Sequence, residues 1–235
     1  MDAEIISLLE KKFLQNLPVL GFFKNYPLEK TFKEDDVVLL TGTSDYTWAY
    51  ISGSSPSALR NVLDAYGYES PYFANVEDWM LPLITHERPL DWKLTTIRYY
   101  MTFDKQVAPP AEPCKPLNAD LVPYIFENSS YKDFTSESYI RDRLEKDISA
   151  GIWRDDALVG WGMTHDDSSL GFLNVLKRYQ GQGLGENLLR CLIHQKREQN
   201  QPVFVNIEPH NHQSINLVTK LGFTQDRQVS WLKLK

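Results

Sequence analysis

The stretch that decides the fold is Tyr-Gln-Gly-Gln-Gly-Leu-Gly-Glu, residues 179–186. It follows an apolar run over residues 170–176, which predicts a strand. It opens into leucines and an isoleucine at three- and four-residue spacing, which predict a helix that ends at about Gln199. Glycine lets the backbone approach an anion closely, and the first turn of a helix carries unpaired N–H donors at the positive end of its dipole. The stretch therefore predicts a binding site for a phosphorylated ligand.

Two common phosphate-binding motifs do not fit this stretch. A Walker loop needs Gly-Lys-Ser or Gly-Lys-Thr, whereas Gly185 is followed by Glu186 and Asn187. A dinucleotide fingerprint needs its third glycine three residues after the second, at the start of a βαβ unit. Here the spacing is shorter and the stretch comes late, after an antiparallel meander. A glycine turn that only packs a helix on a sheet is the alternative without a ligand.

Composition narrows the possible partners of the chain. Its 235 residues carry a formal net charge of −6, which argues against a nucleic-acid partner. No run approaches the ~18–20 apolar residues of a membrane span. Cys191 lies in the predicted helix and is expected to be a small buried apolar residue, while Cys114 lies in a proline-rich segment. Because two such cysteines make no disulfide framework, the sequence predicts a reducing, cytoplasmic location.

A proline-rich linker divides the chain. Prolines at four positions of residues 104–116 favour extended backbone, so the sequence predicts an N-terminal domain over 1–103 and a second domain over 117–235. The first domain is expected to hold a helix over 3–26, strands over 36–41 and 46–52, a helix over 58–66 begun by Ser55 and Pro56, a weaker helix over 76–86 and a strand over 93–103.

The second domain begins with two predicted helices, over 118–126 and 135–148. Strands over 151–154, 158–164 and 170–176 follow as a meander, and after the glycine turn come a strand over 202–207, a short helix near 214–220 and a final strand. This order predicts an α+β fold with a mixed, mostly antiparallel twisted sheet flanked by helices, rather than a doubly wound one.

Residues 180–185 resemble the pyrophosphate-binding signature of the GNAT superfamily of acyl-CoA-dependent N-acyltransferases. That signature is Arg or Gln, two free positions, Gly, one free position, then Gly or Ala, and Val175 matches the strand valine that usually precedes it. A second motif follows: Asn211 and Ser214, then Gly222-Phe223, are similar to the closing motif of the superfamily. The layout resembles the two-half glycine N-acyltransferase-like, or FR47-like, branch. The resemblance implies a first half that is a smaller, degenerate GNAT-like copy with no cofactor motif.

The resemblance also implies a cofactor, acetyl-CoA or another acyl-CoA, and the residues that bind it. Backbone amides of the glycine turn would hold the pyrophosphate at the helix N-terminus. The preceding strand would pair with the pantetheine arm and polarise the thioester carbonyl, and the closing motif would hold the far side of the arm. The expected cofactor-binding residues are Leu173, Asn174, Val175, Gln180, Gly181, Gln182, Gly183, Leu184, Gly185, Glu186, Asn211 and Ser214.

The sequence departs from the superfamily at both positions of proton chemistry. Val218 stands where a tyrosine often protonates the leaving thiolate, and Ser169 or Leu170 stands where a glutamate base is usual. The candidate catalytic residues are His165, Asp167, Glu208 and His210. His165 is interpreted either as the base or as a turn histidine bonded to a neighbouring aspartate. His210 and His212 have no third ligand nearby in sequence, so no metal site is expected.

The sequence thus predicts an acyl-CoA-dependent N-acyltransferase, with acetyl as the expected acyl group. A small-molecule amine or amino acid would attack the thioester directly, without an acyl-enzyme. The expected protein is a monomer or homodimer with no nucleic-acid or membrane partner. Two alternatives are a non-catalytic acyl-CoA-binding sensor and an acetyltransferase that acts on a protein amine.

Overall fold

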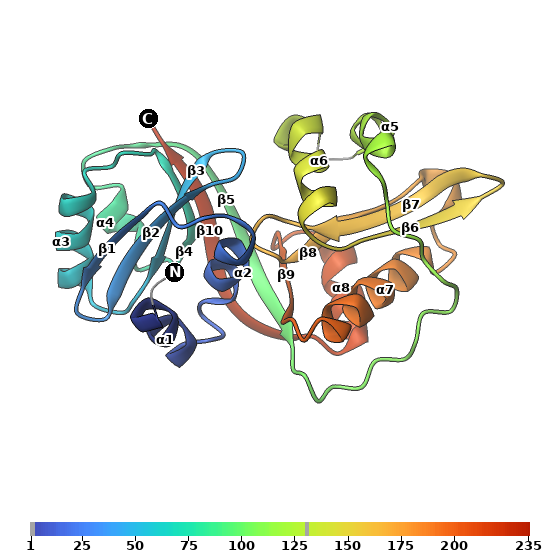
Figure 1. The fold of residues 1–235 in the computed structure, drawn as a ribbon, viewed down its shortest axis with the longest axis horizontal. Helices are drawn as coiled ribbons and strands as arrows, with labels where there is room; N and C mark the ends of the chain where they lie inside the picture. The colour runs from blue at the N-terminus through green and yellow to red at the C-terminus, as the bar shows by residue number, and fades with distance from the viewer. Residues whose placement is uncertain (1–2, 130–131) are drawn as a thin grey trace. The chain divides into compact units, whose positions relative to one another are not determined.

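The computed structural model describes residues 3–129 and 132–235, and the chain divides into two compact units. One unit comprises Met1–Arg98, Ile207–His212 and Gln225–Lys235, and the other comprises Tyr99–Asn206 and Gln213–Thr224. This division differs from the predicted boundary at the C-terminus, where the last strand belongs to the first unit. Figure 1 labels the elements along the chain.

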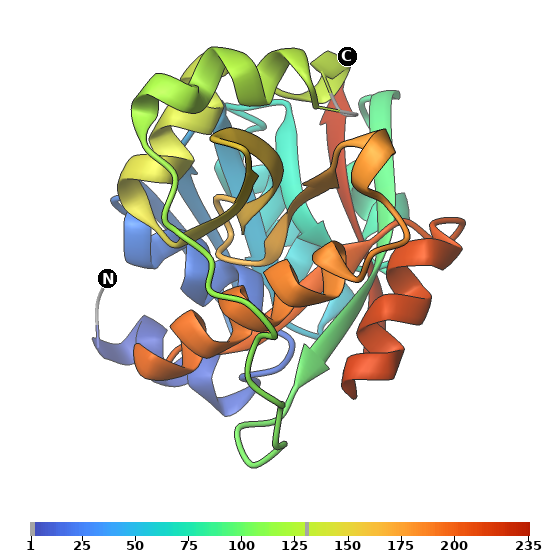
Figure 2. The same cartoon turned by 90° about the vertical axis from the view of Figure 1, so that its right-hand side faces the viewer.

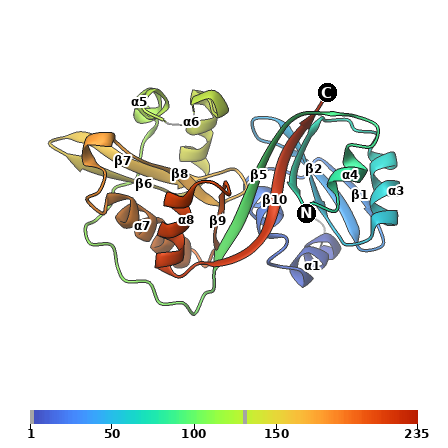
Figure 3. The ribbon, with the colours of Figure 1, turned by 180° about the vertical axis from the view of Figure 1, so that it is seen from behind.

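The first unit is a mixed sheet with helices on both faces. Its elements are α1 (Ala3–Lys11), α2 (Leu17–Asn25), β1 (Lys30–Glu34), β2 (Val37–Thr43), β3 (Thr47–Ser52), α3 (Pro56–Tyr66), β4 (Tyr72–Val76), α4 (Leu81–Ile84), β5 (Leu90–Met101) and β10 (Thr224–Leu234). β1, β2 and β3 pair antiparallel, whereas β3 and β4 pair parallel. β10 lies between β4 and β5 in the strand order, and Figure 3 shows the long strands β5 and β10 side by side.

Strand alternation gives this sheet two buried faces. Along β2, Val37 and Leu39 pack into the cluster that contains α3, while Val38 and Leu40 pack into the cluster that contains α1 and α2. Because side chains of a strand point alternately to opposite faces, a continuous apolar run identifies a strand covered on both sides.

Two predictions for the first unit are wrong, and one strand was not predicted. The helix over 3–26 is two helices, because Pro18 in the first turn of α2 starts a new helix. The helix over 76–86 is the end of β4 followed by the four-residue α4, whose first turn also holds a proline. β1 was not predicted, since this edge strand is largely exposed and polar (Lys-Thr-Phe-Lys-Glu) and shows little apolar alternation.

The second unit holds a three-stranded antiparallel meander with helices on its two faces. The elements are α5 (Val122–Glu127), α6 (Glu137–Lys146), β6 (Ser149–Arg154), β7 (Ala157–Thr164), β8 (Leu170–Val175), α7 (Leu184–Glu198), β9 (Val203–Ile207) and α8 (His212–Leu221). Short 3₁₀ turns precede α5 and α6 (Ala119–Leu121 and Lys132–Phe134), and another, Lys177–Tyr179, follows β8. The α+β fold predicted from the sequence is confirmed.

Glycines in β7 explain how α7 approaches the meander. A Cβ on Gly160 would lie 3.2 Å from Leu188 of α7, and a Cβ on Gly162 would lie 2.9 Å from Leu192. Between them Trp161 points to the other face, where it is 1% exposed in a cluster with α5 and α6. The small residues on one face therefore let the helix pack closely, while the large one fills the core on the other.

β8 and β9 are joined by α7 but belong to different sheets. β8 is the last strand of the order β6-β7-β8, and β9 is the last strand of the other sheet, beyond β5. In contrast, β3 and β4, which are joined by α3, pair with each other. The edge of β8 that faces away from β7 is therefore not paired with any strand among the described residues.

The linker over 104–116 is tied to α7. It forms no helix, it passes in front of α7 in Figure 2, and it is hydrogen-bonded to Asn187 and Arg190 of that helix. Cys114 and Cys191 form a disulfide. Cys191 is buried as predicted, but the expectation that the two cysteines form no disulfide framework is wrong, because the linker returns along α7 and brings Cys114 to Cys191. None of the helices in the part of the chain described here is long and apolar enough to cross a membrane.

Candidate active site

The glycine turn joins β8 to α7 as predicted. Gln180 donates from Nε2 to the carbonyl of Val175 at 2.9 Å, so its side chain closes the turn against the end of β8. Gly181 and Gly183 have φ of 77° and 80°, which favours glycine at both positions. Gly183 is the N-cap of α7 and offers no side-chain acceptor to the first turn. The N–H donors of this turn are therefore not used by a cap.

Space around the turn suits an anion. A Cβ built on Gly181, Gly183 or Gly185 would meet no atom within 4 Å. The turn is exposed over residues 180–183, whereas Leu184 is buried and anchors the helix start. Open space beside free helical donors and a positive dipole end is the arrangement that a pyrophosphate needs. The residues present therefore fit the acyl-CoA implied by the resemblance.

Glu186 does not oppose an anion with a free charge. Its carboxylate lies 2.7 Å from Arg190 and 2.6 Å from Lys220 of α8. Hydrogen bonds from Lys220 and Arg190 hold the pKa of Glu186 below its ordinary value. The two cations together outweigh the one carboxylate, so the first turn of α7 stays favourable to negative charge.

β8 carries a bulge at Phe172. Met163 pairs with Gly171 and Trp161 pairs with Asn174, so two residues of β8 lie opposite one residue of β7. Phe172 has φ of 47°, a left-handed conformation that costs a non-glycine residue of order 1–3 kcal/mol. A bulge releases backbone groups from the ladder and redirects them. On this unpaired edge the released groups can bind a ligand.

His165 lies against this bulge. Its ring is 4.8 Å from the ring of Phe172, and a Cβ on Gly171 would lie 2.2 Å from its Nε2. Only glycine at 171 therefore leaves room for the histidine ring. Neither ring nitrogen of His165 has a hydrogen-bond partner within residues 3–129 and 132–235, so the imidazole is not fixed by an aspartate.

The turn that carries His165 is polar and buried. Asp166, Asp167, Ser168 and Ser169 are each less than 9% exposed. Asp167 accepts from Ser169 through Oδ1, at 2.9 Å from N and 2.6 Å from Oγ, and from Asn206 of β9 through Oδ2 at 3.0 Å. The carboxylate is thus occupied as a structural acceptor. Because buried polar groups need partners, the turn is held in one conformation.

A buried ion pair between Lys196 and Asp147 also stabilises this turn. Lys196 of α7 is fully buried, and it binds Asp147 at 3.0 Å, Ser168 at 2.6 Å and Gln201 at 2.8 Å. Ser168 also donates to Asp147 at 2.9 Å. Burial raises the pKa of Asp147, but the charge and hydrogen bond of Lys196 outweigh burial and leave the pKa below its ordinary value.

Burial favours the neutral form of His165. Burial lowers the pKa of His165, the Asp167 carboxylate raises it, and Arg143 of α6 lowers it again, with a net decrease. Arg143 donates from Nη1 to the carbonyl of His165 at 3.2 Å. Tyr139 of α6 accepts from the N–H of Asp166 at 3.1 Å, and its ring lies 5.9 Å from Phe172.

The other predicted residues lie as follows. Leu173, Asn174 and Val175 form the second half of β8, and Asn174 donates to the carbonyl of Asn128 at 3.4 Å. Glu208 lies 3.3 Å from His210, whose side chain is 80% exposed. Asn211 precedes α8 and Ser214 lies in its first turn, while Val218 is 3% exposed. Among the described residues no three His, Cys, Asp or Glu side chains could hold a metal ion.

Three residues at this site were not found from the sequence. Phe172 carries no local signal for a bulge, because it continues an apolar strand pattern. Tyr139 and Asn206 reach the turn from α6 and β9, which only the tertiary fold brings to it. The run Asp-Asp-Ser-Ser over 166–169 has the sequence of an ordinary exposed turn, and its burial is seen only in the structure.

Comparisons with known proteins concern the family and the fold. Residues 149–232 match the family model described as FR47-like protein. No curated protein matches the sequence. The matched segment contains β6 to β8, the glycine turn, α7, β9, α8 and most of β10.

Solved structures share the fold over nearly the whole chain. A Drosophila protein has a TM-score of 0.80 at 15% identity, with 99% of this chain and 95% of that chain covered. A GCN5-related N-acetyltransferase from Kribbella flavida has a TM-score of 0.61 at 10% identity, covering 94% and 97%. A tandem GNAT protein from the clavulanic acid biosynthesis pathway has a TM-score of 0.52 at 13% identity, covering 93% and 87%.

Identities this low establish a common fold, and the family model supplies the link in sequence. Over residues 149–232 the chain is similar to the FR47-like family, and it shares its fold with the GNAT structures named above.

Proposed function

We propose that this protein is an acetyl-CoA-dependent N-acetyltransferase whose acceptor is the amine of a small molecule or amino acid. The observation that carries the proposal is the continuous path from the bulge at Phe172, along the unpaired edge of β8, to the uncapped N-terminus of α7. An acyl-CoA carries a pyrophosphate and, at the end of an amide-bearing arm, a thioester. Along this path the N-terminus of α7 offers N–H donors to the pyrophosphate, and the bulge in β8 offers them to the thioester.

The backbone of β8 would bind and polarise the acyl donor. Leu173, Asn174 and Val175 can add the pantetheine arm to the free edge of the strand through main-chain hydrogen bonds. An N–H released at the bulge can donate to the thioester carbonyl, where negative charge develops during attack. When bound, acetyl-CoA supplies an activated acyl group, so the chain needs no nucleophile of its own.

His165 is the residue we propose as general base. An amine attacks only when neutral, and the base that takes its proton must itself be neutral at working pH. The decrease in the pKa of His165 meets this condition, and its ring lies beside the bulge with no hydrogen bond to a neighbouring side chain. Asp167 is proposed to act on His165 through its charge, since its oxygens are bonded to Ser169 and Asn206.

The cofactor-binding roles of Gln180 and Glu186 are proposed to be indirect. Gln180 holds the turn closed on β8, and Glu186 orients Arg190 and Lys220 beside the first turn of α7. Gly181, Gln182, Gly183, Leu184 and Gly185 would donate their backbone N–H groups. Asn211 and Ser214 keep their proposed place on the far side of the arm.

The preference for a small amine rests on the two-half layout. The order strand–strand–strand–helix–strand–helix–strand occurs twice, as β1 to β5 and as β6 to β10. This repetition, and the tandem GNAT protein among the similar structures, supports the glycine N-acyltransferase-like branch. The domains over 1–103 and 117–235 are proposed on the same ground.

One observation favours a second candidate, an acyl-CoA-binding sensor without catalysis. Val218 occupies the position of the tyrosine that often protonates the leaving thiolate, and it is buried at 3% exposure. In such a protein the glycine turn would bind acyl-CoA normally. Glu208, which is partly buried, lies 3.3 Å from the exposed His210, and both remain candidates for proton transfer in the enzyme.

The test is amine-dependent release of CoA thiol from acetyl-CoA across a panel of amines and amino acids. For an enzyme we expect release with at least one acceptor, and a loss of roughly 10²–10⁴-fold in kcat for His165→Gln, the range of general-base catalysis. The matched control is His86→Gln, an exposed histidine of the first unit, which should leave the rate unchanged.

Calorimetric titration with CoA separates the outcomes. If His165→Gln binds CoA like the native protein but transfers slowly, the loss is chemical. Tight CoA binding with no thiol release for any amine would support the sensor, and absence of CoA binding would refute both functions.

A further inference from the structure

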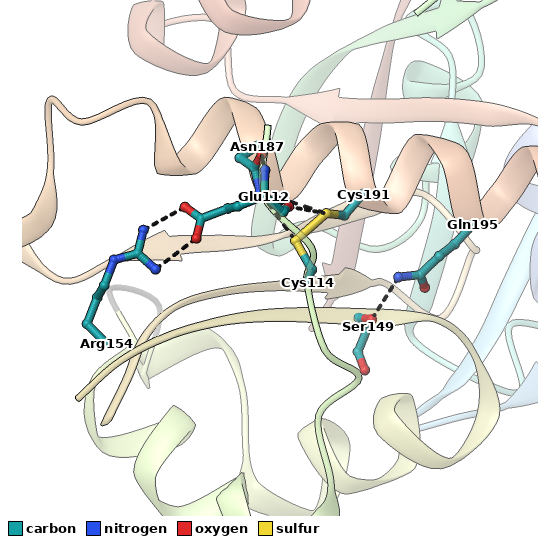
Figure 4. The surroundings of a disulfide bond; sticks show 7 residues. All are labelled: Glu112, Cys114, Ser149, Arg154, Asn187, Cys191 and Gln195. Carbon is teal, nitrogen blue, oxygen red and sulfur yellow. Dashed lines mark hydrogen bonds and ion pairs between the residues drawn. A yellow bond between two sulfur atoms is a disulfide. The ribbon is translucent and has the colours of Figure 1, made fainter. Parts of the chain in front are cut away.

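The linker is attached to the first two turns of α7 by paired polar contacts (Figure 4). Asn187 donates from Nδ2 to the carbonyl of Glu112 at 2.9 Å, and its Oδ1 accepts from the N–H of Glu112 at 3.1 Å. One turn later, Cys191 is bonded to Cys114 of the linker. The side-chain amide thus pairs with the linker backbone as a neighbouring strand would.

Further contacts hold the linker on either side of the disulfide. The carboxylate of Glu112 receives two hydrogen bonds from Arg154 of β6, at 2.8 and 2.6 Å. The Arg154 hydrogen bonds hold the pKa of Glu112 below its ordinary value. Earlier in the linker, the carbonyl of Ala108 accepts from Arg190 at 3.0 Å and lies 3.3 Å from Nε2 of His194.

The same helix turn carries the candidate pyrophosphate site. The backbone N–H of Asn187 donates to the carbonyl of Gly183 at 3.0 Å, which is the hydrogen bond that closes the first turn of α7. Asn187 therefore binds the glycine turn through its backbone and the linker through its side chain. A change in the linker can therefore reach the glycine turn through this residue.

We propose that the Cys114–Cys191 disulfide is a thiol-responsive clamp that tunes the affinity of the glycine turn for CoA. The proposal rests on the acyl-CoA site proposed above and adds its regulation. In the oxidised chain the linker holds Asn187, and with it the first turn of α7, in the binding conformation. Reduction leaves the linker held to the helix by polar contacts alone, so the first turn of α7 is less firmly ordered before CoA binds, and affinity falls.

The exchange chemistry favours attack on Cys114. Cys114 is half-buried, whereas Cys191 is 6% exposed. A thiolate of a dithiol attacks Sγ of Cys114, and the S–S bond breaks with Cys191 leaving as thiolate. The second thiol of the reductant then displaces Cys114 and closes its own disulfide. Two protons from the reductant end on the two cysteines, and two electrons pass to the protein.

Cellular context makes the reduced form relevant. The Cys114–Cys191 disulfide removes the ground on which the sequence predicted a reducing, cytoplasmic location, but in a reducing compartment the two thiols would be kept reduced. The disulfide would then form under oxidising conditions and raise acyl-CoA affinity. The polar contacts of Glu112 would keep the linker near α7 while the thiols are reduced.

The experiment compares CoA binding by titration calorimetry in the oxidised protein, in protein reduced with dithiothreitol, and in Cys114→Ser/Cys191→Ser. We expect Kd to rise roughly five-fold on reduction, by loss of preorganisation. The double variant should match the reduced protein and ignore dithiothreitol. Reoxidation of the native chain should restore the original Kd.

A second variant tests the coupling through the linker. Glu112→Gln weakens the contact with Arg154 and should raise Kd only when the disulfide is reduced, because the covalent bond otherwise holds the linker. Hydrogen exchange of residues 181–187, measured without CoA, should be faster in the reduced protein.

Equal Kd and equal exchange in the two redox states would overturn the clamp, and the disulfide would then be purely structural. Failure of CoA to bind in either state would count against the proposed function instead. Hydrogen exchange would still decide whether the disulfide orders the turn.

Discussion

Gly183 and Gly185 allow a test that measures the effects of backbone conformation on protein stability and on CoA affinity separately. A Cβ on Gly183 or on Gly185 would meet no atom within 4 Å, so alanine is not excluded by contact at either position. The backbone differs, however. Gly183 is the N-cap of α7 with φ of 80°, whereas Gly185 is the second residue of the helix and has no left-handed φ. Alanine adds the same methyl group to two different conformations.

The expected magnitudes follow from these conformations. A left-handed φ costs an alanine roughly 1–2 kcal/mol. If the turn keeps its conformation in Gly183→Ala, the free energy of unfolding falls by that amount. If the turn relaxes, CoA must restore it on binding, and Kd rises by roughly 5–30-fold, because ~1.4 kcal/mol corresponds to tenfold. The two losses together should come to about 1–2 kcal/mol.

Gly185→Ala is the matched control and should change stability in the opposite direction. Glycine within a helix is roughly 0.5–1 kcal/mol less favourable than alanine, so the variant should be more stable. The GNAT signature accepts Gly or Ala at this position, so Kd for CoA should stay within about twofold of the native value, a difference of roughly 0.4 kcal/mol.

Urea unfolding and titration calorimetry with CoA measure both quantities for each variant. The reasoning fails if Gly183→Ala loses neither stability nor affinity. It also fails if Gly185→Ala weakens CoA binding more than Gly183→Ala does, since the methyl group itself, rather than φ, would then be the obstacle.

Two further predictions concern the turn that carries His165. Lys196→Met should lower the free energy of unfolding by roughly 3–5 kcal/mol, because it leaves Asp147 buried and unpaired. Measured by urea unfolding, the double variant Lys196→Met/Asp147→Leu should recover most of this loss. Equal losses in the two variants would contradict the ion-pair explanation. The pH profile of kcat/KM should show its acidic limb below pH ~6.5, because burial and Arg143 lower the pKa of His165 and only the neutral ring accepts a proton. Protonation of His165 should also lower the free energy of unfolding below that pH. If the acidic limb of the kcat/KM profile lies above pH ~6.5 and persists in His165→Gln, another group is responsible for the titration.

Helix caps and glycine turns were predicted correctly, because each depends on residues close together in the sequence. Ser55 caps α3 by accepting from the N–H of Ala58, with Pro56 in the first helical position, as the sequence indicates. Gly181 and Gly183 take the left-handed conformations that a glycine-rich turn implies. Each of these features depends on residues at most a few positions apart, so the sequence contains the whole cause.

Features that join distant segments escaped prediction. Cys114 and Cys191 are 77 positions apart, and nothing near either cysteine indicates the other. Ser168 looks like an ordinary exposed turn residue, yet Lys196 reaches it from α7. His165 could be named as a candidate base, but its contact with Gly171 and Phe172 depends on how the meander folds back. Here tertiary packing, rather than local propensity, decides the environment.

The two strand–helix–strand segments of the chain differ where the cofactor site is expected. β3 and β4 pair as parallel strands, and the N-terminus of α3 is already capped by the hydroxyl of Ser55. β8 and β9 do not share a sheet, and the N-terminus of α7 follows glycines that offer no cap. In the first segment, β3 and β4 pair with each other, and an N–H of the first turn of α3 is bonded to Ser55. In the second segment, no strand among the described residues pairs with the outer edge of β8, and no side chain caps α7, so these groups can bind a ligand. These differences give a physical reason to expect one acyl-CoA site per chain, at α7, because a strand edge and a helix end can bind a cofactor only where the protein has not already satisfied them.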